Sequence, residues 1–86
     1  CKRVLYWGRV QGVGFRYTTR SLAHGYQVTG FVRNLVNGQV ELVVEGESDE
    51  VARFLDALAE RMRDYIKGHT SEDRDPGGFQ EFAITP

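Results

Sequence analysis

The sequence predicts an α+β fold whose segments follow the order strand, helix, strand, strand, helix, strand. Three observations support this order. An apolar run leads into a glycine-rich loop and a helix, an Asn-Gly pair separates two runs of β-forming residues, and a long amphipathic segment follows them. This order is the split βαβ, or ferredoxin-like, arrangement, in which a mainly antiparallel sheet carries both helices on one face.

The first strand and the first helix flank the glycine-rich loop. Residues 4–7 form a short apolar run, which is typical of a buried central strand. Residues 15–24 predict a helix, because several of their apolar side chains fall near one face. Gly25 stands where such a helix would end.

The middle of the chain predicts a β-hairpin. β-forming residues over 26–33 are followed by the turn signal Asn37-Gly38 and by a return strand over 39–45. In the return strand, apolar residues alternate with polar ones. This alternation predicts one buried face and leaves Glu41 exposed on the other.

The second helix is the clearest amphipathic segment of the chain. Ser48 is the predicted N-capping residue, and the carboxylates of Asp49 and Glu50 would face the positive end of the helix dipole. Apolar side chains then recur at helical spacing and predict a core-facing stripe. The stripe consists of Val51, Phe54, Leu55, Leu58 and Met62.

The C-terminal third carries weaker signals. Residues 65–73 are polar apart from Tyr65 and Ile66, and they predict an edge strand. Residues 75–78 predict a turn, and the apolar residues within 79–84 predict a final short strand.

Length and composition limit the class of protein. A chain of 86 residues supports one core, so residues 1–86 are expected to form a single domain. No apolar run is long enough to span a membrane. The single cysteine, Cys1, excludes an internal disulfide and fits a reducing compartment. We therefore expect a soluble, cytoplasmic monomer without membrane partners.

The charges are divided unevenly along the sequence. Residues 1–40 contain six Lys or Arg and no Asp or Glu, whereas the rest of the chain contains five basic and twelve acidic residues. This division suits an anionic ligand at one site better than a basic face that tracks nucleic acid. Because the Cys and His residues lack ligand spacing, we expect no metal and no other cofactor.

Residues 8–16, Gly-Arg-Val-Gln-Gly-Val-Gly-Phe-Arg, have the composition of a phosphate-binding loop. Glycines allow successive backbone N–H groups to turn toward one point, and the start of the following helix adds free donors and a positive dipole end. Arg16 adds a planar cation that can hold two phosphate oxygens. Arg9, Arg20 and Gln11 are candidates for supporting contacts around this site.

Two segments together resemble the acylphosphatase family, small hydrolases that split the carboxyl-phosphate bond of acyl phosphates. The first segment is 8–16. The second is Gly-Phe-Val-Arg-Asn at 30–34, which continues through Gly-Gln-Val at 38–40 to Gly46 without a gap. The resemblance implies a hydrolase that takes an acyl phosphate and releases a carboxylate and inorganic phosphate.

The resemblance also implies roles for individual residues. In the family, the arginine matching Arg16 binds the phosphoryl group together with loop amides, and the asparagine matching Asn34 orients the attacking water. The chemistry agrees, since a carboxylate leaves readily and hydrolysis then needs mainly positioning and charge neutralisation. Arg33 is expected on the opposite face of the strand as an exposed charge. The candidate phosphate-binding residues are Gln11, Gly12, Val13, Gly14, Phe15 and Arg16, and the candidate catalytic residues are Arg16 and Asn34.

Three alternatives to this assignment differ in how well the sequence fits them. A nucleotide-binding loop would end in Gly-Lys-Ser/Thr or follow Gly-x-Gly-x-x-Gly, and residues 8–16 do neither. An RNA-recognition module shares the fold but stacks bases on aromatic residues, which residues 39–45 lack. A non-catalytic or channelling domain is the third, because acylphosphatase-like segments also occur at the N-terminus of a large hydrogenase-maturation carbamoyltransferase.

Overall fold

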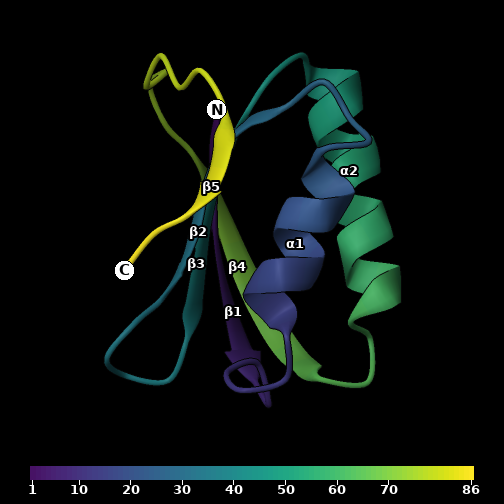
Figure 1. Cartoon of the computed structure of the whole chain (residues 1–86), viewed down its shortest axis with the longest axis vertical. Helices are drawn as coiled ribbons and strands as arrows, with labels where there is room; N and C mark the ends of the chain where they lie inside the picture. The colour runs from purple at the N-terminus through teal and green to yellow at the C-terminus, as the bar shows by residue number, and fades with distance from the viewer.

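A computed structural model describes all 86 residues as two layers, with a sheet on one side and two helices packed together against one of its faces (Figure 1). The helices are α1 (Phe15–Ala23) and α2 (Ser48–Arg61). The strands are β1 (Lys2–Gly8), β2 (Thr29–Asn34), β3 (Val40–Glu45), β4 (Ile66–Asp73) and β5 (Phe82–Ile84). This arrangement confirms the predicted α+β, ferredoxin-like fold.

The sheet has the strand order β4-β1-β3-β2-β5. β1 lies between β3 and β4 and is antiparallel to both, and β2 is antiparallel to β3. β4 is the edge strand that the polar sequence of residues 65–73 predicts. β5 extends the sheet at the other edge by pairing in parallel with β2, with Val32 opposite Ile84.

The hydrophobic core lies between the sheet and the helices. On α1 the buried residues Phe15, Thr19 and Ala23 recur every four positions, and the hydroxyl of Thr19 donates to the carbonyl of Phe15 at 2.8 Å. Tyr6 on β1 packs against Phe15, with 5.1 Å between the ring centroids. This contact fixes the beginning of α1 relative to the centre of the sheet.

The predicted exposure of Glu41 is wrong. Its side chain is only 5% exposed. Because Glu41 alternates with the core residues Val40 and Leu42, it lies on the other face of the sheet, which no helix covers (Figure 1). The Nε groups of Arg3 on β1 and Arg33 on β2 each donate to its carboxylate at 2.6 Å. Residue alternation places Glu41 on this face, but only the neighbouring strands bring the two arginines over it.

The predicted N-cap of the second helix is displaced by one residue. Glu47 occupies the N-cap position with an extended backbone and no side-chain capping bond, so Ser48 is the first helical residue. Asp49 and Glu50 do lie in the first turn, as expected. The predicted stripe is otherwise correct, since all its members except the partly buried Leu55 are in the core.

Neither helix is long and apolar enough to cross a membrane.

Candidate active site

The loop between β1 and α1 has a backbone that only glycine adopts readily. Gly12 and Gly14 have φ angles of 78° and 79°, in the left-handed region. A Cβ at either position would meet no atom within 4 Å, so the requirement for glycine is conformational rather than steric. The two left-handed residues reverse the chain between the end of β1 and the start of α1.

This loop leaves a run of backbone donors free. None of the amides from Gln11 to Tyr17 donates to a protein acceptor, whereas the amide of Thr18 already bonds the carbonyl of Gly14 at 2.9 Å. Gly14 is the N-cap of α1 and has no side chain that could accept hydrogen bonds from the free N–H groups of the first turn. The free amides and the positive end of the helix dipole therefore lie together.

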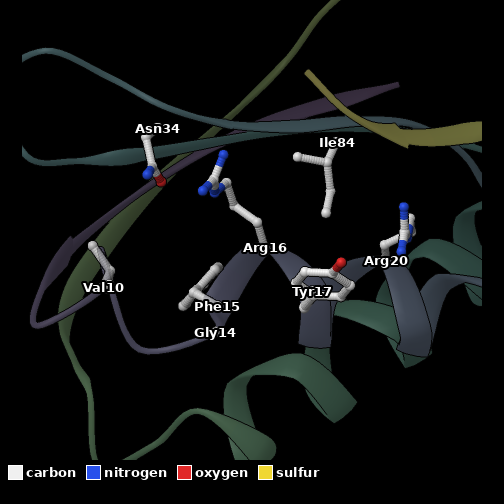
Figure 2. A pocket seen from close by; sticks show the side chains of 9 residues that line it. Val10, Gly14, Phe15, Arg16, Tyr17, Arg20, Asn34 and Ile84 are labelled. Carbon is white, nitrogen blue, oxygen red and sulfur yellow. The ribbon is translucent and has the colours of Figure 1, made fainter. Parts of the chain in front are cut away.

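A cleft of about 460 Å³ opens beside this loop (Figure 2). The loop, α1, the end of β2 and the end of β5 each contribute to its walls. The lining residues are Val10, Gly12, Gly14, Phe15, Arg16, Tyr17, Arg20, Asn34 and Ile84.

Arg16 and Asn34, which are 18 positions apart in the sequence, meet in this cleft. Figure 2 shows the guanidinium of Arg16 extending from the first turn of α1 toward the Asn34 side chain. Asn34 is the last residue of β2, opposite Val40, and its amide oxygen is buried with no hydrogen-bond partner. A buried carbonyl without a donor is uncommon and often marks a functional position.

Gln11 and Val13 do not line the cleft, and their predicted part in phosphate binding rests on their backbone amides rather than on their side chains. The side-chain amide Nε2 of Gln11 donates to the backbone carbonyls of Leu35 and Gln39 at 2.8 and 2.9 Å. Val13 packs against the core. Gln11 thus ties the loop to the hairpin that carries Asn34, while the backbone amides of both residues stay available.

The cleft is positively charged. Arg16 and Arg20 are its only charged lining residues, and neither forms an ion pair. By contrast, Arg33 beside Asn34 is exposed as expected but paired with Glu41. Burial alone would raise the pKa of Glu41, but the hydrogen bonds from Arg3 and Arg33 outweigh it and hold the pKa below its ordinary value.

Four lining residues were not assigned to the binding set from sequence: Val10, Tyr17, Arg20 and Ile84. Helical spacing offers a signal for Arg20, which lies one turn after Arg16 on α1. Ile84 reaches the cleft only because β5 pairs in parallel with β2, and no local pattern indicates that pairing.

The structure contains no group of three or more His, Cys, Asp or Glu side chains arranged to hold a metal ion. His24 and His69 are both exposed and lie outside the cleft, as the sequence predicts.

Fold and cleft together define a small α+β protein with free backbone amides and two unpaired arginines around one cleft. Comparison with known proteins gives the family. The acylphosphatase family model matches residues 2–84. An acylphosphatase from Treponema denticola is 43% identical over 82 residues, covering 94% of this chain and 87% of the relative.

Solved structures agree. An acylphosphatase from Bacillus subtilis has a TM-score of 0.88 at 28% identity, covering 99% of this chain and 97% of that one. HypF from T. kodakarensis has a TM-score of 0.87 at 27% identity, covering 100% of this chain but only 12% of that one.

The chain belongs to the acylphosphatase family. It is a hydrolase of acyl phosphates, and the comparisons do not favour the nucleic-acid-binding or non-catalytic alternatives.

Proposed function

We propose that the cleft holds the phosphoryl group of an acyl phosphate on Arg16 and the loop amides, and that Asn34 positions the water that attacks it. One observation carries this assignment: the unpaired guanidinium of Arg16 and the side chain of Asn34, whose amide oxygen has no protein partner, share one cleft with a run of free amides.

Arg16 and the loop neutralise charge on the phosphoryl group. The guanidinium presents parallel N–H donors that match two phosphate oxygens, and the amides from 11 to 15 add donors fixed by the glycine conformations. These groups are in place before substrate arrives, which is the property that makes electrostatic stabilisation effective in a transition state.

Asn34 holds the nucleophile. Its amide oxygen has no protein partner to lose when the side chain turns toward the cleft. There it accepts a hydrogen bond from a water molecule, which directs a lone pair of that water toward phosphorus. The water oxygen bonds to phosphorus as the bond from phosphorus to the acyl oxygen breaks. The carboxylate leaves with the electron pair, and the proton of the water passes to the phosphate product.

No metal ion takes part in this proposal, because Arg16 and the amides supply the charge that a cation would otherwise provide. A chelator is expected to leave the rate unchanged.

We also propose that residues 1–86 act as one domain, as a cytoplasmic monomer that binds neither nucleic acid nor membrane. The ion pairs of Glu41 support the exclusion of nucleic acid, since they neutralise Arg3 and Arg33 on the uncovered face of the sheet.

The test separates binding from turnover. Phosphate release from acetyl phosphate gives the turnover, and titration with inorganic phosphate gives the affinity. Asn34→Ala should lower kcat about a hundredfold while changing the phosphate Kd by less than about threefold.

Arg16→Lys keeps the positive charge but loses the planar pair of N–H donors. It should therefore both lower kcat and weaken phosphate binding, with a loss of about 3 kcal/mol in transition-state stabilisation.

Arg61→Gln serves as the control, because Arg61 is exposed at the end of α2 and outside the cleft. Normal turnover in Asn34→Ala would rule out the water-positioning role. Normal activity in Arg16→Lys would show that a single positive charge beside the amides suffices and that the paired donors of arginine are not needed.

A further inference from the structure

A second arginine in the cleft has no role in the proposed chemistry. Arg20 lines the same cleft as Arg16 and forms no ion pair or side-chain hydrogen bond. The two arginines are four residues apart on α1, so their Cα atoms differ by about 6 Å along the helix axis and lie on one face.

The side chain of Arg20 is held rather than free. Its guanidinium carbon lies 5.1 Å from the centroid of the Tyr17 ring, a cation–π arrangement. Figure 2 shows Tyr17 and Arg20 together on the side of Arg16 away from Asn34, with Ile84 above them. Stacking on the ring limits the positions that the guanidinium can adopt and keeps it at the cleft.

The residues that line the cleft around Arg20 do not compete with a ligand for its guanidinium. No Asp or Glu lines the cleft, and α1 contains no acidic residue. Tyr17 is 69% exposed and Ile84 is apolar, so this end combines a cation with apolar surface. A phosphoryl group on Arg16, with its water at Asn34, would direct the acyl group away from Asn34 and toward Arg20.

We infer that Arg20 determines specificity for the acyl part of the substrate, and that the preferred substrates are acyl phosphates with a second anionic group on a short acyl chain. This inference rests on the proposed placement of the phosphoryl group at Arg16. The second anion binds Arg20, and the methylene groups between the two anionic ends contact Tyr17 and Ile84.

The experiment compares two substrates of nearly equal shape. Succinoyl phosphate ends in a carboxylate, and succinamoyl phosphate ends in the uncharged amide. The carboxylate is the same in the ground state and the transition state, so its contact with Arg20 should act through KM rather than kcat. We expect the native chain to have about a two- to fivefold higher kcat/KM for succinoyl phosphate, the range expected of a partly exposed ion pair.

Arg20→Gln should abolish this preference by raising KM for succinoyl phosphate, and Arg20→Lys should retain most of it. Arg61→Gln, which removes an exposed arginine outside the cleft, should leave the ratio of the two kcat/KM values unchanged.

The outcomes are distinguishable. Equal kcat/KM values for both substrates, or a preference that persists in Arg20→Gln, would overturn the role of Arg20 while hydrolysis itself continued. If Arg61→Gln lost the preference to the same extent, the preference would reflect the net charge of the protein and not the position of Arg20. Hydrolysis of neither substrate would instead contradict the proposed function, and the inference would fall with it.

Discussion

Asn34 illustrates how one residue serves both the fold and the chemistry. Its backbone completes the pairing of β2 with β3, and its side chain ends in an amide oxygen without a partner. The sequence motif predicts the position of Asn34, and the chemistry of an amide predicts that it stays neutral. The unpartnered oxygen follows only from the packing of the surrounding strands.

Asn34→Asp tests the electrostatics of this position. The change preserves shape but places a negative charge beside the bound anion, so at pH 7 phosphate should bind at least about tenfold more weakly than to the native chain. The bound anion disfavours ionisation of the new carboxylate, so binding is coupled to proton uptake and the defect should shrink as the pH falls toward about 4. Calorimetric titration at several pH values measures it.

Asn37→Asp is the matched control, because Asn37 is exposed on the hairpin turn and lies outside the cleft. A defect of equal size in both variants would mean that net charge, and not the position of Asn34, governs phosphate affinity.

At the scale of elements, the site depends on contacts between segments that are distant in the sequence. Gln11 connects the loop to the hairpin through the carbonyls of Leu35 and Gln39, which flank the turn beside Asn34. The sequence identifies the loop and the hairpin separately. It could not predict their connection, since the long-range partner of a glutamine amide depends on tertiary packing rather than on a local pattern.

Glu41 connects three strands in the same way and gives a pH dependence of stability. Its folded-state pKa lies below the ordinary value of 4.5. The stabilisation is therefore complete above about pH 4.5 and is lost as the pH falls through the lower, folded-state pKa. Glu41→Gln should lower the free energy of unfolding at pH 7 by about 1–3 kcal/mol, and this loss should vanish in acid.

Thermal unfolding from about pH 3 to pH 7 measures this difference, with Glu60→Gln as the control because Glu60 is 73% exposed. If the melting temperatures of Glu41→Gln and the native chain changed with pH in the same way over the whole range, the ion pairs of Glu41 would contribute no net stability.

For the whole molecule, phosphate binding should stabilise the folded state, because the loop conformation and the meeting of Arg16 with Asn34 exist only there. Free phosphate at ten times its Kd should add about 1.4 kcal/mol and raise the melting temperature by several degrees. Chloride at matched ionic strength should leave the melting temperature unchanged, and phosphate should not raise the melting temperature of the Arg16→Ala variant. An unchanged melting temperature at tens of millimolar phosphate would indicate that the cleft does not hold this anion.

Sequence reasoning recovers the strand and helix order of the whole molecule because hydrophobic period, the Asn-Gly turn and the glycine loop are local signals. It also predicts that Arg16 and Asn34 come together, and both line the cleft. It misses the burial of Glu41 and the arrival of Ile84 at the cleft, since both depend on which strands become neighbours. These two errors concern contacts across the sheet, and the N-cap of α2, misplaced by one residue, concerns an element boundary.

The fate of the oxygen atom from water tests the central claim most directly. If Asn34 positions water against a phosphoryl group held by Arg16, hydrolysis of acetyl phosphate in water labelled with heavy oxygen must place the label in inorganic phosphate and leave acetate unlabelled. Mass spectrometry of both products after one turnover, with unlabelled phosphate added to a parallel sample to exclude later exchange, gives the answer. Label in acetate would mean that water attacks the carbonyl carbon, and it would contradict the assignment of Arg16 and Asn34 to phosphoryl transfer.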